Sequence, residues 1–281
     1  MKRLLIPIIL LLSMALPAMS QLMVSMEPTK KQFVNGEPMT MRLTISNNTG
    51  KSIKLSGTDT IPWLDIHVER NEGSEALPQT RFANFPNVQI PPGKSVSRRI
   101  DLRYFYDFSR DGYYKAIAVV RPPNMRNVYA STRALFSVVS GMPIWSETIA
   151  TRNNMRCKYS VCGLLEQKKQ RMFVQVKDGT SGASINTVGV GEWLSFIKPL
   201  CRVDSQTNLH VLFLTTPNIY CQAIVNPKGE RVSLNYFKRV PGPQPVLVYN
   251  PNGTITVAGA IPFDPFVKPK NTLKDASQIP Q

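Results

Sequence analysis

The stretch from Val34 to Ile53, VNGEPMTMRLTISNNTGKSI, decides the fold class of this chain. Polar residues separate the apolar ones across its middle, in the order Met39, Thr40, Met41, Arg42, Leu43, Thr44, Ile45, Ser46. A period of two turns one face of a β-strand toward a core and the other toward water. The pattern stops at the residues NNTG, a composition typical of turns. The stretch therefore predicts a half-buried strand that ends in a tight turn.

The same alternation recurs twice later in the first half of the chain. Leu64, Ile66 and Val68 alternate with polar residues, and so do the apolar residues between 134 and 138. A Pro-Pro-Gly-Lys turn at residues 91–94 precedes an expected strand over residues 96–102. Short strands at such intervals, with no amphipathic helix among them, predict an antiparallel sandwich over residues 21–140.

The segment YDFSRDGYY, residues 106–114, leads directly into an expected strand. Gly112, one intervening residue and then Tyr114 have the spacing of a tyrosine corner, in which a tyrosine hydroxyl bonds back to nearby backbone. With Val34–Ile53, this motif makes residues 21–140 resemble the immunoglobulin-like sandwiches of exported bacterial proteins. The resemblance implies a domain that binds or spaces other modules, and it implies no chemistry.

Ser140–Pro143 interrupts the pattern, and we expect a domain boundary there. The turns NPKG at 226–229 and NPNG at 250–253 each predict a hairpin, because proline fixes one dihedral and glycine accepts a left-handed one. A third hairpin is expected at Asp178–Gly179. Residues 141–260 thus predict an antiparallel β-meander, as a small barrel or twisted sheet of about eight strands. The proline-rich residues 261–281 predict a flexible tail.

Residues 1–20 have the form of an export signal. Lys2 and Arg3 precede an apolar run from Leu4 to Leu12, and Ala18 and Ser20 supply the small residues before a cut. The apolar run is shorter than the roughly 20 residues that span a bilayer, so we expect cleavage, with no transmembrane segment left and a periplasmic or secreted location.

The chain is strongly basic, with 34 Lys and Arg residues against 18 Asp and Glu and a formal net charge of +16. Such an excess raises the local concentration of anionic partners. The charge either serves solubility alone or favours contact with an anionic envelope polymer or another exported protein, and the sequence leaves the partner open. Nucleic acid is disfavoured, because aromatic and basic residues do not alternate as on a single-strand platform.

All four cysteines, Cys157, Cys162, Cys201 and Cys221, lie in the second half. An even number of cysteines in an exported protein predicts disulfides. Three pairings are open, and we lean toward Cys157 with Cys162 and Cys201 with Cys221. The spacing does not fit a zinc site, so no metal or other cofactor is expected.

Catalytic motifs are absent from the sequence: no H-E-x-x-H, G-x-S-x-G or phosphate-binding glycine loop occurs. His67 shares a strand face with Asp65 and Glu69, which fits a metal or proton-transfer cluster less well than a solvated strand face. His210 is expected at a strand edge. The dense aromatic cluster around residues 104–114 is interpreted as core packing, with a sugar-stacking platform as the alternative.

Two groups of cations are the candidate binding residues. Lys168, Lys169 and Arg171 fall at an expected hairpin tip, and Lys238 with Arg239 ends another strand. The sequence thus predicts an exported, non-catalytic binding or envelope-associated protein. The alternatives are a hydrolase that acts on an envelope polymer and a proteinase-inhibitor-like module.

Overall fold

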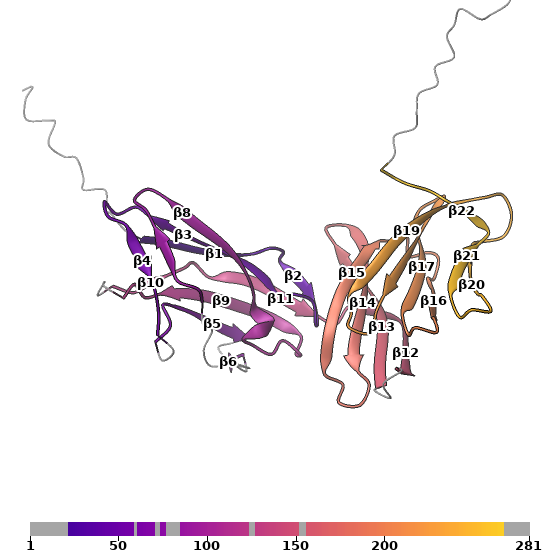
Figure 1. Ribbon diagram of the computed structural model, residues 1–281, viewed down its shortest axis with the longest axis horizontal. Coiled ribbons are helices and arrows are strands. Elements are labelled where there is room, and N and C mark those ends of the chain that lie inside the picture. Colours follow the sequence, from indigo (N-terminus) through magenta and orange to yellow (C-terminus); the bar gives the residue numbers. More distant parts are fainter. Residues whose placement is uncertain are drawn as a thin grey trace, which may run out of the picture. The chain divides into compact units, whose positions relative to one another are not determined.

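The computed structural model describes residues 22–58, 61–70, 74–76, 85–123, 127–151 and 156–266 (Figure 1). Within these ranges the chain forms strands and turns with one short 3-10 helix, η2 (Leu102–Tyr104), so the predicted all-β class is confirmed. The chain divides into two compact units: Met1–Phe33 with Pro38–Val139, and Val34–Glu37 with Ser140–Gln281. The expected signal peptide, residues 1–20, lies outside the described residues.

The first unit is built from three antiparallel groups of strands (Figure 1). One sheet has the order β1 (Leu22–Pro28), β3 (Thr40–Asn47), β8 (Ser95–Asp101). The other has the order β2 (Gln32–Val34), β11 (Ala134–Val139), β9 (Gly112–Val120), β5 (Leu64–Arg70), β6 (Ser74–Glu75), with β10 (Tyr129–Ala130) paired to β9. The short strands β4 (Ile53–Leu55) and β7 (Val88–Ile90) pair separately.

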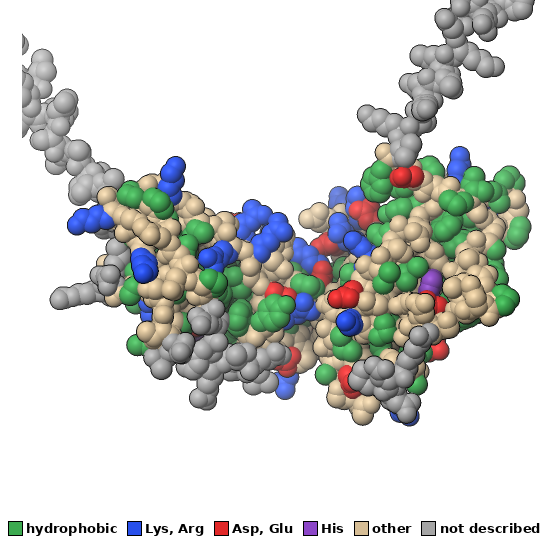
Figure 2. All heavy atoms as spheres, viewed as in Figure 1, with side chains coloured by type: hydrophobic (Ala, Val, Ile, Leu, Met, Phe, Trp, Pro, Cys, Tyr) green, Lys and Arg blue, Asp and Glu red, His purple; other side chains and the backbone are tan. Residues whose placement is uncertain are grey.

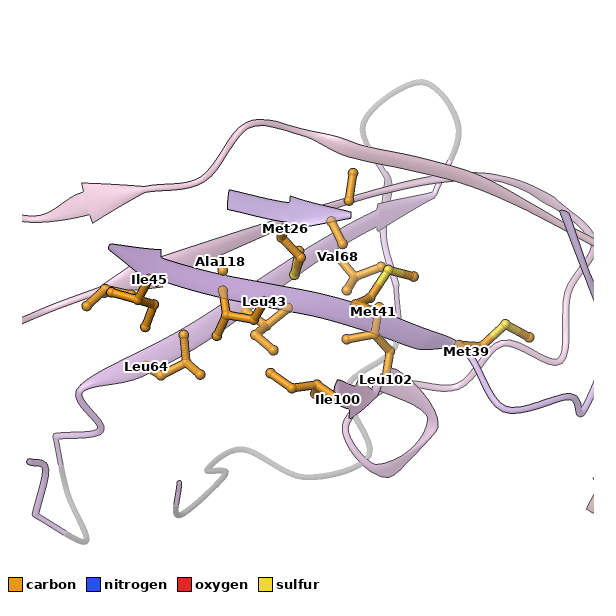
Figure 3. Close-up of a cluster of buried hydrophobic side chains, with 14 of the residues drawn as sticks. Met26, Met39, Met41, Leu43, Ile45, Leu64, Val68, Ile100, Leu102 and Ala118 are labelled. Carbon is orange, nitrogen blue, oxygen red and sulfur yellow. The ribbon is translucent and has the colours of Figure 1, made fainter. Parts of the chain in front are cut away.

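A single apolar core joins the two larger sheets of this unit. Met41, Leu43 and Ile45 point inward from β3, because alternate residues of a strand face the same side. Figure 3 shows them near Leu64 and Ala118, which come from the opposite sheet. The period of two in the sequence therefore sets the inner face of β3, and the polar residues between the apolar ones point outward.

The second unit consists of two successive meanders and one additional hairpin. The first sheet has the order β12 (Met142–Ala150), β13 (Arg156–Glu166), β14 (Lys169–Asp178), β15 (Ser184–Glu192). The second has the order β16 (Leu200–Val203), β17 (Leu209–Thr216), β18 (Ile219–Val225), β19 (Arg231–Arg239), β22 (Ala260–Pro262). The hairpin is β20 (Val246–Tyr249) with β21 (Ile255–Ala258).

The two meanders pack as a sandwich, which replaces the single barrel or open sheet that we expected. Tyr159 and Val174 of the first sheet share one core with Val211 and Phe213 of the second. The other face of the second sheet is also covered, because Leu212 packs with Leu247 of the hairpin. Strand β17 therefore lies between two apolar layers, which explains its nearly continuous apolar sequence.

Residues Val34–Glu37 belong to the second unit, although the sequence places them inside the first half. Val34 packs against Cys162 and Phe173 on the outer face of the first meander. The carbonyl oxygen of Asn35 accepts bonds from Thr187 Oγ1 at 2.7 Å and Gln175 Nε2 at 3.2 Å. A four-residue segment is thus held to this sheet by both apolar contact and buried hydrogen bonds.

The three predicted hairpins are present. Gly229 and Gly253 have φ angles of 75° and 80°, and each donates its N–H to the asparagine carbonyl three residues earlier, at 2.9 Å. In the third hairpin, Asp178 Oδ1 accepts bonds from the backbone N–H groups of Ser181 and Thr180, and these bonds lower the pKa of Asp178. Local turn chemistry was therefore sufficient to place these reversals.

Residues 261–266, which we expected in a flexible tail, are part of the second unit. Ile261 and Pro262 belong to β22 and pair with β19, and the N–H of Phe263 donates to the carbonyl of Tyr236 at 2.8 Å. The ring of Phe266 makes an edge contact with Tyr236. Pro262 fits in β22 because β22 is the edge strand of its sheet, where a residue without a backbone N–H need not donate to a neighbouring strand. Residues 267–281 lie outside the described residues.

All four cysteines are free in the structure, and the pairing that we favoured does not fit the positions of their strands. Cys157 and Cys162 lie on opposite faces of β13, five residues or about 16 Å apart along an extended strand. Cys201 and Cys221 lie on β16 and β18, which β17 separates, at about two strand spacings or 10 Å. A disulfide requires Cα atoms within about 7 Å, so neither pairing fits the sheets.

Candidate functional site

The predicted hairpin tip is present between β13 and β14. Gln167 and Lys168 have φ angles of 51° and 66°, the left-handed pair that a two-residue turn requires. Lys169 Nζ lies 3.0 Å from Glu192 Oε1, and Arg171 Nε lies 3.2 Å from Glu166 Oε2. Two of the three cations at this tip are therefore balanced by carboxylates of the same sheet.

The second predicted pair, Lys238 and Arg239, ends β19 and is exposed. The guanidinium group of Arg239 donates to the carbonyl of Gly242 at 3.2 Å, and its backbone N–H donates to Asn218. Arg239 thus helps to close the turn that follows its own strand. The prediction that these cations bind an anion stays a prediction.

The structure brings both groups of cations to one end of the second unit. The segment after β15 crosses from the first sheet to the second at this end. The backbone N–H of Trp193 donates to the carbonyl of Gln170, and the backbone N–H of Leu194 donates to the carbonyl of Leu214. Gln170 directly follows the hairpin tip on β14. Leu214 lies near the end of β17, next to the turn that leads into β18. The first residue of β18, Ile219, pairs with Lys238 of β19. The two groups therefore share an end of the sandwich, which the sequence alone did not indicate.

The tyrosine corner forms as its spacing predicted. The Tyr114 hydroxyl donates to the carbonyl of Arg110 at 2.6 Å, and burial raises the pKa of Tyr114, so the hydroxyl keeps its proton. The neighbouring Tyr113 points outward and is 77% exposed. The ring of Tyr114 packs with Phe108 and Phe136. The aromatic cluster is thus largely core around the corner, with Tyr104 and Tyr113 on the surface.

His67 lies on a solvated strand face. Its Nε2 atom is 3.1 Å from Asp65 Oδ2, while Glu69 pairs instead with Lys115 at 2.6 Å. Asp65 also lies 3.5 Å from Arg121. Each carboxylate has a cation as its partner, so the geometry is that of surface ion pairs; no group of potential metal ligands is present in the described part of the chain.

His210 is the second residue of β17, near the strand end where it was expected, and its side chain is buried. Its Nε2 lies 3.1 Å from Asp204 Oδ2, and its Nδ1 lies 3.0 Å from Gln222 Nε2. Gln222 can only donate through that nitrogen, so Nδ1 accepts and Nε2–H donates to Asp204. Both ring nitrogens are used, which leaves neither free for proton transfer to a substrate. The sequence signal that could have indicated burial is the apolar run Val211–Leu214 directly after His210.

A groove of about 630 Å³ lies beside this network, between the edge strands β12 and β16 and the hairpin strand β20. Two carboxylates line it, Glu147 and Asp204. Asp204 accepts from His210, from both nitrogens of Asn208 and from the backbone of Gln206. Burial raises the pKa of Asp204, but the bonds from His210 and Asn208 outweigh it and lower the pKa overall. Asp204 is therefore a saturated, ionised anchor and lacks the raised pKa of a general acid.

A polar surface with two exposed arginines occurs on the first unit, on the outward side of β1, β3 and β8; we call it the β1-β3-β8 face. Arg42 of β3 lies directly opposite Arg99 of β8, and both side chains are exposed. Among the described residues, no carboxylate oxygen lies within 4.0 Å of either guanidinium group. Glu27 is next to Arg42 in the same row, on β1, without pairing to it at that distance. Figure 2 shows basic side chains over the part of the first unit where Figure 1 places β3 and β8.

Hydroxyl groups fill the next rows of this face. Ser25, Thr44 and Ser97 form one row, in which Thr44 Oγ1 donates to Ser97 Oγ at 3.2 Å. Ser46 and Ser95 lie in the following row and are joined at 2.8 Å. The sequence showed the polar members of each strand, but the register that aligns them is visible only in the structure.

The comparisons with known proteins add no assignment. No family model matches the chain, and no curated protein matches its sequence. The described residues include no helix that is long and apolar enough to cross a bilayer.

Proposed function

We propose that this chain is an exported, non-catalytic binding protein that holds an anionic polymer on the β1-β3-β8 face. The observation that carries the proposal is the Arg42–Arg99 pair: two exposed guanidinium groups face each other across neighbouring strands without a carboxylate partner. Like charges placed directly opposite each other destabilise a sheet. An anion that bridges the pair would remove this repulsion and form charge-assisted hydrogen bonds to both groups.

The β1-β3-β8 face suits this role better than the predicted hairpin tip. At the tip, Glu166 and Glu192 already balance Arg171 and Lys169, so a polymer would have to compete with these ion pairs. On the β1-β3-β8 face, the nearest carboxylate in the same row is Glu27, which pairs with neither arginine. The tip residues keep a secondary role in the proposal, since they add to the positive potential that attracts the polymer.

The alternative of a hydrolase finds less support. A hydrolase of this kind needs two carboxylates across a cleft, one of them with a raised pKa. The groove does contain two, Glu147 and Asp204, but the bonds from His210 and Asn208 lower the pKa of Asp204. The sandwich architecture of the first unit also accords with the resemblance to immunoglobulin-like binding domains.

Binding of dextran sulfate, measured at rising salt concentration, tests the proposal. We expect the wild-type affinity to fall steeply with salt, because exposed charges are screened within about 8 Å at physiological ionic strength. Arg42→Gln/Arg99→Gln should weaken binding by about tenfold or more at low salt. The matched control, Lys168→Gln/Lys169→Gln/Arg171→Gln, removes three charges and should have the smaller effect. Absence of binding at low salt, or binding that ignores salt, would contradict the proposal.

Export is tested separately by sequencing the N-terminus of the secreted or periplasmic material. The mature chain should begin at Gln21, because Ala18 and Ser20 provide the small residues before the cut. Recovery of the intact Met1 chain from a membrane fraction would contradict both the cleavage and the location.

A further inference from the structure

The geometry points to an acidic polysaccharide as the polymer that the β1-β3-β8 face binds, with its chain lying along the strands; we propose this as the ligand class. The inference rests on the proposed function, and it adds which polymer the face selects and how the polymer lies. It depends on three properties of the face: the position of its two arginines, its rows of hydroxyl groups and the absence of aromatic rings from the outward positions of β1, β3 and β8.

The positive charges of the face occupy one row only. Arg42 and Arg99 lie side by side across β3 and β8, so their planar groups can hold one carboxylate or sulfate between them. Rows on one face of a sheet recur every second residue, at about 7 Å. The next two rows toward Asn47 carry no charge. A polymer with an anion at every backbone position would leave most of its charges without a partner on this face.

The uncharged rows are rich in hydroxyl groups. Ser25, Thr44 and Ser97 stand next to the arginine row, and Ser46 with Ser95 follows them. A hydroxyl both donates and accepts, as a sugar hydroxyl does, so either partner can supply the proton. The bonds within these rows, at 3.2 Å and 2.8 Å, use one donor each and leave lone pairs open to a ligand. A sugar chain that is anchored by one acid group at the arginine pair would place its next rings over these hydroxyls.

The composition of the face argues against nucleic acid. The outward positions of β1, β3 and β8 hold serine, threonine, arginine, glutamate, aspartate and one methionine, Met23, and no aromatic ring. Proteins that bind single strands without sequence preference combine positive charge with aromatic side chains on which bases stack. The acidic residue of the last row, Asp101, is engaged by Arg103 at 2.9 Å and by the backbone N–H of Met39 at 3.0 Å. It therefore orders the end of β8 rather than adding a free charge to the face.

The test separates the hydroxyls from the charge. The variant Thr44→Val/Ser97→Ala removes two hydroxyls and no charge from the face. Its matched control, Thr148→Val/Ser146→Ala, makes the same changes on the exposed edge strand β12 of the second unit. Thr44→Ser keeps the hydroxyl and should behave as wild type, which checks that any loss is due to the missing group. Thermal melts of all variants establish that each is folded.

Four polymers of matched charge are compared by calorimetry: polygalacturonate, dextran sulfate, polyphosphate and single-stranded oligo-dT. We expect one or both polysaccharides to bind more tightly than the other two, and their ratio distinguishes a carboxylate from a sulfate ligand. Thr44→Val/Ser97→Ala should lose about threefold to tenfold in polysaccharide affinity and leave polyphosphate binding unchanged. The control variant should match wild type for all four polymers.

The outcomes distinguish this inference from the proposed function. If polyphosphate or oligo-dT binds as tightly as the polysaccharides, or if the hydroxyl variant keeps full affinity, the ligand class is wrong while anionic binding stands. If none of the four polymers binds at low salt, both the ligand class and the proposed function are wrong.

Discussion

The imidazole of His210 lies between Asp204 and Gln222, with its Nε2 atom 3.1 Å from Asp204 Oδ2. Both side chains are largely buried, at 5% exposure for the histidine and 11% for the aspartate. Asn208 adds two more donors to the same carboxylate. This arrangement fixes the turn between β16 and β17, and the lowered pKa of Asp204 makes the stability of the fold depend on pH in the acid range.

The first prediction concerns Asp204→Asn. The hydrogen bonds of Asp204 lower its pKa in the folded state, so its contribution is present above the unfolded pKa of about 3.9. That contribution is lost as pH falls through the folded pKa. Asp204→Asn should cost about 1.5–3 kcal/mol near neutral pH and make the acid limb of the stability curve shallower. Urea titrations between pH 3 and pH 7 measure this.

Glu147→Gln is the control for this prediction. It removes the other carboxylate of the same groove, which accepts none of the bonds around His210. Its stability curve should run parallel to that of the wild type. If Asp204→Asn also runs parallel, the hydrogen bonds do not favour the ionised carboxylate.

A second prediction separates the two neighbouring tyrosines of β9. Tyr114→Phe removes the partly buried bond to Arg110 and should lower the free energy of unfolding by about 0.5–1.5 kcal/mol. Tyr113→Phe changes an exposed side chain on the opposite strand face and should have an effect below about 0.5 kcal/mol. Denaturant titrations of both variants are the measurement. Equal effects would show that the corner bond does not contribute.

A third prediction tests how the segment Val34–Glu37 is held. Gly36 has a φ of 82°, and a Cβ atom there would lie 2.3 Å from Ser184 Oγ and 2.7 Å from Thr187 Oγ1. Gly36→Ala should therefore add a steric clash to the 1–2 kcal/mol or so that a left-handed alanine costs. Gly182→Ala, with a φ of 72° and no atom within 4 Å of the added Cβ, carries only the backbone cost.

The difference between these two variants isolates the contact of the segment with the sheet. Hydrogen exchange of the Thr187 amide reports it directly, since this amide donates to the carbonyl of Gly36 at 3.0 Å. We expect faster exchange in Gly36→Ala and unchanged exchange in Gly182→Ala. Equal exchange in both variants would mean that the clash is relieved without moving the segment.

A fourth prediction concerns the cysteines. Burial raises the pKa of Cys162, Cys201 and Cys221 to about 12 and also raises that of Cys157, so the reactive thiolate is scarce at neutral pH. Ellman's reagent should react slowly with the folded protein and with four thiols once the chain is unfolded without reductant. Fewer than four thiols under those conditions would show that disulfides form in spite of the strand positions.

The sequence by itself determined the properties that depend on neighbours along the chain. Alternation at Met39–Ser46 placed β3 and its inner face, because successive side chains of a strand point to opposite sides. The NPKG and NPNG turns placed two hairpins, because asparagine, proline and glycine set the local dihedrals. The spacing of Gly112 and Tyr114 gave the corner for the same reason.

The tertiary structure decided everything that depends on which strands pair and in what register. Arg42 and Arg99 were each visible as polar strand residues, but only the pairing of β3 with β8 sets them opposite each other. The partners of His210 were not predicted, because Asp204 follows β16 and Gln222 lies on β18, and only the pairing of these strands with β17 brings them to its ring. The favoured pairing of Cys201 with Cys221 does not fit the sheet because β17 lies between their strands. Strand periodicity is a local property, whereas register and layering arise from contacts between segments that are distant in sequence.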